Sequence, residues 1–263
     1  MLSIIIPSYK DHLLQKTIDS ILENSEIGND ELEVIPVLDG YWPNPALKEN
    51  PKVKVLHLEK KLGMRGAINA GVSAAKGEYI MKCDSHCMFS KGFDKILLGE
   101  IKDDWVVAPR LYRLDIDKWE VMRGHGMDYQ KFVYHQPTNK IAAQEWISRT
   151  KKRKNILIDE NIVFQGSCWL MSRKHWDNVI KRLEDENYGT FAQEPTEIAI
   201  KTFAAGGKVM VNKKTWYAHK HRKFGRIGCP SSKEVRKGND YVLNHLRDDL
   251  DKINQYFGLS GLS

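Results

Sequence analysis

Strand-like and helix-like segments alternate through the first 85 residues, and this alternation restricts the possible folds more than any other feature. The predicted strands are residues 3–7, 32–40, 52–58 and 79–83, and the predicted helices between them are residues 11–25 and 63–77. Such alternation is typical of βαβ units and a mostly parallel sheet. Ligands of such sheets bind outside the carboxyl ends of the strands. Tyr9, Asp39 and Asp84 all fall at predicted strand ends.

The second half of the chain is less regular but continues the α/β pattern. It predicts strands within residues 105–122, 162–173 and 208–219, and helices at residues 174–184, 195–207 and 232–257. Pro195 in the first turn and the glycines that follow Ala205 favour the second of these helices. Residues 130–160 are polar and aromatic and are the expected excursion from the sheet.

The charge balance bears on the partners of the protein. Lys and Arg exceed Asp and Glu by 41 to 34, a net +7, and much of the excess lies in residues 148–155 and 219–226. This suits an anionic partner such as a nucleotide or nucleic acid, although simple solubility is an equal explanation. Four cysteines are too few for a disulfide framework, so we expect a reducing, cytoplasmic setting. No apolar stretch approaches the roughly 20 residues that span a membrane.

The segment CDSHC, residues 83–87, carries the clearest chemistry. Asp84 and His86 are two residues apart, so in an extended segment both side chains leave the same face. A carboxylate and an imidazole together suit Mn²⁺ or a related cation. An aspartate that closes a turn beside an exposed histidine is the alternative. Zinc ligation by Cys83, His86 and Cys87 is disfavoured because a structural site needs four ligands.

Other candidates have comparable alternatives. Asp39 suits a uracil imide or a ribose hydroxyl, but Asp-Gly also forms turns. Tyr9 could stack on a base or cover the sheet edge. Lys61 and Arg65, near a helix start, suit a phosphate.

Two glutamates and a histidine complete the candidates. Glu194 and Glu197 flank Pro195 at a helix start, where they could orient an acceptor or act as a base. The helix dipole alone also favours acids there. His219 ends a strand and is a candidate ligand.

Four segments, taken in order, resemble one family. They are residues 63–71 (GMRGAINAG), 83–87 (CDSHC), 165–176 (QGSCWLMSRKHW) and 191–209 (FAQEPTEIAIKTFAAGGKV). Over roughly residues 1–226 the chain resembles a GT-A fold glycosyltransferase of the family 2 type. Its closest likeness is to the catalytic domain of polypeptide N-acetylgalactosaminyltransferases. Ala192, Gln193 and Pro195 depart from the family pattern, so the sugar is not specified.

The resemblance implies a role for each matching residue. It makes Asp84, His86 and His219 the ligands of manganese. It makes Glu194, Glu197 and Arg222 the catalytic residues. It assigns the donor to Pro7, Tyr9, Asp39, Lys61, Arg65, Asp84, Ser85, Gly166, Trp169 and Phe191. A basic loop at residues 220–236, with Gly225 and Gly228 as pivots, is expected to close over the donor.

The implied function is metal-dependent transfer of a sugar from a UDP-sugar to a hydroxyl acceptor. A protein Ser or Thr is the first expected acceptor and a hydroxyl-bearing modified base of DNA the second, with retention of anomeric configuration favoured. A sugar-nucleotidyltransferase and an inactive nucleotide-sugar-binding protein are the alternatives from other classes.

We also predict the domain organisation. Residues 1–230 form the catalytic domain, with a nucleotide-binding half at 1–110 and an acceptor and sugar half at 111–230. Residues 231–263 form a helical tail.

Overall fold

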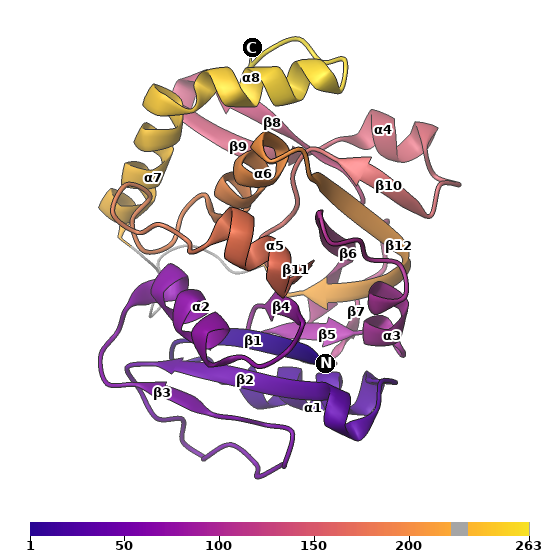
Figure 1. The fold of residues 1–263 in the computed structure, drawn as a ribbon, viewed down its shortest axis with the longest axis vertical. Helices are drawn as coiled ribbons and strands as arrows, with labels where there is room; N and C mark the ends of the chain where they lie inside the picture. The colour runs from indigo at the N-terminus through magenta and orange to yellow at the C-terminus, as the bar shows by residue number, and fades with distance from the viewer. Residues whose placement is uncertain (222–230, 263) are drawn as a thin grey trace.

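In a computed structural model, which describes residues 1–221 and 231–262, ten strands form one large sheet (Figure 1). The strands are β1 (Leu2–Ser8), β2 (Leu32–Asp39), β3 (Leu56–Leu58), β4 (Tyr79–Cys83), β5 (Cys87–Phe89), β6 (Trp105–Asp115), β7 (Glu120–Val121), β10 (Ile158–Asn161), β11 (Cys168–Ser172) and β12 (Lys208–His219). The central order is β10-β12-β6-β11-β4-β1-β2-β3, with β5 beside β12 and β7 beside β6.

The directions of the strands bring the predicted site residues to one edge. β1 runs parallel to β2 and β4, and β12 runs parallel to β6. Because β11 is antiparallel to both β4 and β6, those two strands share one direction. The carboxyl ends of β1, β2, β4 and β12 therefore meet at the same edge of the sheet. The predicted α/β fold with a largely parallel centre is confirmed.

Helices cover both faces of the sheet. They are α1 (Leu14–Asn24), α2 (Gly63–Ala74), α3 (Phe93–Leu98), α4 (Ile147–Lys152), α5 (Arg173–His175), α6 (Glu194–Ala204), α7 (Ser232–His245) and α8 (Arg247–Tyr256), with short helical turns at Asn29–Glu31, Gln136–Thr138 and Trp176–Ile180. None of the helices in the described ranges combines the length and the apolar character that crossing a bilayer requires.

The core divides into two layers because successive strand residues point to opposite faces. Ile4 and Ile6 of β1 pack with α1 and α3 on one face. Ile5, between them, packs with α2, α6 and α8 on the other face. All three isoleucines are completely buried, and this is why the strand is apolar at each position from Ile4 to Ile6.

The expected excursion forms a separate two-stranded sheet. β8 (Gln130–His135) and β9 (Lys140–Glu145) pair antiparallel, and their buried side chains join the core layer that contains α8. Asn254 of α8 donates a hydrogen bond to the Phe132 carbonyl of β8. The predicted domain boundaries stay a prediction.

Some predicted elements are shorter in the structure. The third strand begins at Leu56 rather than at residue 52, and β11 begins at Cys168 rather than at residue 162. The helix predicted at residues 174–184 is a short α-helical turn followed by a π-helical segment, Trp176–Ile180. Apolar content alone cannot fix these ends, because loop residues that enter the core are apolar as well.

Candidate functional site

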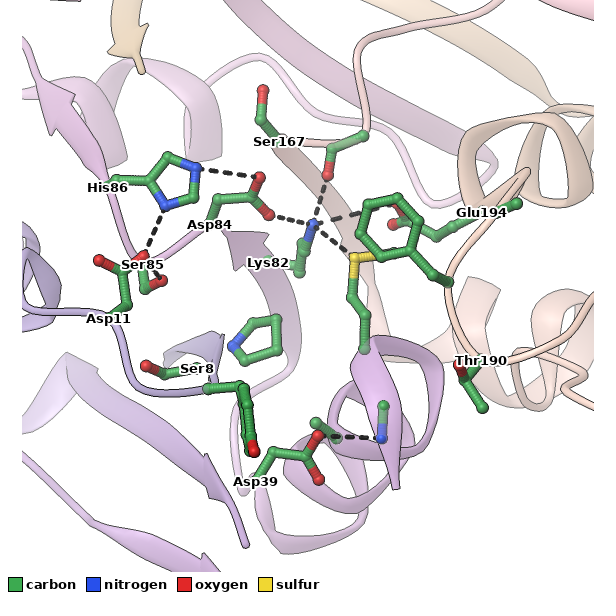
Figure 2. Close-up of a pocket in the computed structure, with 18 of the residues that line it drawn as sticks. Ser8, Asp11, Asp39, Lys82, Asp84, Ser85, His86, Ser167, Thr190 and Glu194 are labelled. Atoms are coloured by element: carbon green, nitrogen blue, oxygen red, sulfur yellow. Dashed lines mark hydrogen bonds and ion pairs between the residues drawn. The ribbon is translucent and has the colours of Figure 1, made fainter. Parts of the chain in front are cut away.

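A cavity of about 400 Å³ opens at the carboxyl ends of the central strands. Eleven residues predicted from the sequence line it: Pro7, Tyr9, Asp39, Lys61, Asp84, Ser85, His86, Gly166, Phe191, Glu194 and His219. They come from seven separate stretches of the chain that meet at this edge of the sheet, and Figure 2 shows several of them around the pocket. The predictions therefore converge on a single pocket.

Asp84, His86 and His219 form the one cluster of at least three potential metal ligands found among the described residues. One ligand atom from each lies within 4.8 Å of the others. Asp84 Oδ2 is 3.1 Å from His219 Nε2 and 3.9 Å from His86 Nε2. We expected Asp84 and His86 to lie in one extended segment, but they do not. They lie in the turn between β4 and β5, and the turn brings both side chains to the same point.

Asp11 orients this cluster from the loop after β1. Its Oδ2 accepts a hydrogen bond from Ser85 at 2.6 Å and lies 2.8 Å from His86 Nδ1. With Nδ1 engaged, His86 directs Nε2 towards Asp84 (Figure 2). A carboxylate behind a histidine in this way fixes the tautomer and the ring orientation of metal-binding histidines.

The protonation states of the cluster suit a cation. Burial alone would raise the pKa of the Asp84 carboxyl, but Lys82 and His219 outweigh it and hold that pKa well below its usual value. Burial lowers the pKa of His219, despite the opposing effect of Asp84. Asp84 is thus ionised and His219 neutral near pH 7, which are the forms that bind metals.

The far end of the cavity is aromatic and basic. The Lys61 ammonium lies 4.0 Å from the centre of the Tyr9 ring. Asp39, also in the wall, accepts hydrogen bonds from the backbone amides of Leu62 at 2.6 Å and Gly63 at 2.9 Å. Its carboxylate therefore caps the start of α2. Both of its oxygens already accept a backbone hydrogen bond before any ligand binds.

Glu194 begins α6 and closes the opposite wall. Only 1% of the residue is exposed, and burial raises the pKa of its carboxyl although Lys82 and Trp169 favour the charged form. Trp169 Nε1 donates a hydrogen bond to Oε1, and Lys82 Nζ is 4.0 Å from Oε2. A Cβ at position 166 would come closer than 3.0 Å to Oε2, so Gly166 is required for this approach.

Arg65 and Glu197, predicted for the diphosphate and for catalysis, are not in the cavity. Arg65 is completely buried and donates to Glu197, to the Ala192 carbonyl and to the Glu184 carbonyl. Glu197, 1% exposed, also accepts from Lys201 at 2.7 Å. We correct both predictions: the two residues form a buried ion pair that joins α2 to α6.

Trp169 also differs from its predicted role. It is completely buried in β11, outside the cavity lining, and its indole nitrogen holds Glu194. It therefore supports a wall residue from outside the cavity lining. Arg222 and the predicted pivots Gly225 and Gly228 lie outside the described residues.

Sequence reasoning missed two residues of the site. Asp11 lies 75 residues from His86 in the sequence, so their contact has no local sequence signal. Lys82 interrupts the apolar run of β4, and a charge in a strand that is otherwise buried was a signal available in the sequence.

Residues 188–193, here called the rim, lead into α6 and are held by α7. Thr190 N donates to Glu234 Oε2 at 3.0 Å. Gln193 Nε2 donates to Asn239 Oδ1 at 2.5 Å. Since Thr190 and Gln193 line the cavity, the C-terminal helices help to position its wall.

Comparison with known sequences gives a consistent set of similarities. A family model described as glycosyl transferase family 2 matches residues 3–180. Polypeptide N-acetylgalactosaminyltransferase 13 of Homo sapiens is 24% identical over 194 residues, which are 73% of this chain and 34% of that protein. The glycosyltransferase GlyG of Streptococcus pneumoniae serotype 4 is 31% identical over 124 residues, 44% of this chain and 40% of GlyG. The chain thus spans well under half of the length of these relatives.

Solved structures are similar in fold. A crystal structure of GalNAc-T7 with UDP, GalNAc and Mn²⁺ aligns with a TM-score of 0.74 at 16% identity, over 99% of this chain and 55% of that chain. Residues 1–349 of S. aureus TarS in complex with UDP-GlcNAc align with a TM-score of 0.60 at 14% identity, over 98% of this chain and 73% of that one.

Proposed function

The chain belongs to glycosyl transferase family 2, and we propose that it transfers a sugar from a UDP-sugar, held through a divalent cation, to a hydroxyl group of a protein. One observation carries the proposal: Asp84, His86 and His219 converge at the mouth of a cavity at the carboxyl edge of the sheet. That edge is where open α/β sheets bind their ligands.

The ligand set fits the cation. Two imidazoles and one carboxylate suit Mn²⁺ and related ions. His219 directs Nε2 towards Asp84 Oδ2 at 3.1 Å, so this nitrogen and the carboxylate oxygen face the same point. When bound, such a cation supplies Lewis-acid charge that stabilises a departing diphosphate.

We assign the nucleotide to the other end of the cavity. Tyr9 offers an aromatic face for the uracil ring, and base stacking on such faces stabilises binding by roughly 1–3 kcal/mol. Lys61, whose ammonium is 4.0 Å from the centre of the Tyr9 ring, adds positive charge at this end of the cavity. The complexes of the similar solved structures with UDP and UDP-GlcNAc support a UDP-sugar as the donor.

Glu194 is proposed to orient the sugar or the acceptor hydroxyl. Its oxygens face the Trp169 indole and the Lys82 ammonium, so this carboxylate is poorly placed to remove a proton. An inverting transferase needs a carboxylate free to act as a base. We therefore propose retention of anomeric configuration. A protein hydroxyl as acceptor is supported by the polypeptide transferases among the relatives.

The test is UDP release from a panel of UDP-sugars with Mn²⁺, with and without a Ser/Thr-rich peptide. Asp84→Ala and His219→Ala are expected to lower the rate by at least about 100-fold, since replacing even a residue that only orients a metal ligand costs about 10–100-fold. His175→Asn is the matched control, because His175 is a buried histidine outside the cavity.

Two outcomes would count against the proposal. Equal rates in the wild type and in both ligand variants would remove the cation cluster from the reaction. Stimulation by hydroxymethylated DNA but not by peptide would overturn the acceptor class and leave sugar transfer intact.

A further inference from the structure

Lys82 is a fully buried charge in the middle of the central sheet. Its side chain is 1% exposed, and the rest of β4 from Ile80 to Cys83 is apolar. A lysine is almost never buried in this way without fixed partners, because removing the ammonium from water costs several kcal/mol. The contacts of the Lys82 ammonium therefore bear on its role in the site.

Its partners are four residues that line the cavity: Met64, Asp84, Gly166 and Glu194. Nζ donates to Asp84 Oδ1 at 2.7 Å and to the Gly166 carbonyl, and lies 4.0 Å from Glu194 Oε2 and 4.0 Å from Met64 Sδ (Figure 2). An ammonium has three N–H groups. Two are taken by Asp84 and Gly166, and the third is left for the side of Glu194 and Met64.

This arrangement divides the two oxygens of Asp84. Oδ1 is held by Lys82, and only Oδ2 faces His219 and His86. A carboxylate often binds cations through both oxygens. Here one oxygen is occupied from inside the protein, and a positive charge stands directly behind the cation cluster.

The ammonium is paired on two sides. Its nitrogen is 2.7 Å from Asp84 Oδ1 and 4.0 Å from Glu194 Oε2. Lys82 also separates two carboxylates that would otherwise repel each other across the cavity.

We propose that Lys82 is a positioning residue that restricts Asp84 to one free oxygen and weakens the cation site in the absence of nucleotide. This inference rests on the proposed function, because it concerns the same cation cluster. A diphosphate adds negative charge and oxygen ligands, so the cation binds tightly only when the nucleotide is present. The built-in ammonium thus couples cation binding to donor binding.

The experiment is a titration of the full chain with Mn²⁺ alone, followed by calorimetry, with and without UDP. Lys82→Met has a similar length and no charge. It is expected to tighten Mn²⁺ binding without UDP by about tenfold or more, because a positive charge near the cation is removed. The gain from adding UDP should shrink by the same factor. Lys82→Arg should restore the weak binding of the wild type.

Lys213→Met is the matched control. Lys213 is also a buried lysine, 7% exposed, but it donates to the Arg153 carbonyl at 2.7 Å and is absent from the cavity lining. Its loss should lower the melting temperature and leave Mn²⁺ binding unchanged. If Lys82 has only a structural role, Lys82→Met should likewise have a lower melting temperature and unchanged Mn²⁺ binding.

Each result decides the question. Weaker or unchanged Mn²⁺ binding by folded Lys82→Met overturns the inference and leaves the proposed function standing. Failure of the wild type to bind Mn²⁺ with UDP overturns both. If Lys82→Met does not fold, Glu194→Gln tests the same balance: its Mn²⁺ binding should weaken several-fold, since the ammonium then acts on Asp84 alone, and unchanged binding refutes the coupling.

Discussion

Replacing Glu197 by Gln should cost stability and spare catalysis. Glu197 is 1% exposed and pairs with Arg65, which is completely buried. The substitution keeps the shape of the side chain but leaves the Arg65 guanidinium without a counter-charge. Breaking a buried pair in this way costs about 3–5 kcal/mol. Lys201, its other partner, is 35% exposed and can return to water, so it adds little.

The expected shift in melting temperature follows from the size of the chain. At about 2.1 cal/mol/K per residue, 263 residues give an unfolding entropy of about 0.55 kcal/mol/K. A loss of 3–5 kcal/mol therefore lowers the melting temperature by about 5–9 °C. Urea unfolding followed by tryptophan fluorescence measures the free energy, and UDP release at 25 °C measures kcat of the folded fraction.

Glu194→Gln is the matched comparison, because Glu194 lies three residues away on the same helix and is equally buried. Lys82, 4.0 Å from Glu194, keeps Asp84 as a partner at 2.7 Å, so we expect a smaller loss of stability than for Glu197→Gln. Its kcat should fall by about 100-fold or more. The reasoning is refuted if Glu197→Gln lowers kcat to that extent while its free energy of unfolding stays within 1 kcal/mol of the wild type.

Three further predictions follow from single contacts. Gly166→Ala should lower UDP release and cost about 1–3 kcal/mol, because its Cβ would overlap the Glu194 carboxylate; Gly99→Ala, in an ordinary helical conformation, should change neither quantity. Tyr9→Ala should raise the Kd of UDP by about tenfold, measured by calorimetry, whereas Tyr9→Phe should not. Burial lowers the pKa of His175 in the folded state, so the unfolded chain binds more protons at low pH, and the free energy of unfolding should fall as the pH drops below 6.5. His175→Gln should reduce that slope in unfolding experiments between pH 5 and 7, and an unchanged slope would contradict the assignment.

The fold was predictable because its signals are local. Apolar runs such as residues 3–7, alternating with segments of helical spacing, specify strands and helices without long-range information. The ends of the elements were less accurate, since Phe164 is in the core without belonging to a strand. Burial in a loop leaves the same trace in a sequence as burial in a sheet.

The sequence predicts which residues belong to the site better than it predicts where their side chains point. Asp84, His86 and His219 were identified from an ordered set of motifs, and the structure brings them together. The same motifs assigned Arg65 to the donor and Glu197 to catalysis, because a motif records which residues occur and not which way they point. Both side chains turn inward, where each neutralises the other.

The attachment of the rim to α7 has a consequence for any shortened form of the protein. The family match ends at residue 180, and a cut near residue 230 would appear to spare the whole cavity. Such a cut would remove Glu234 and Asn239, which hold Thr190 and Gln193. We therefore expect the smallest active unit to extend into α7, which braces a wall formed 44 to 46 residues earlier in the chain.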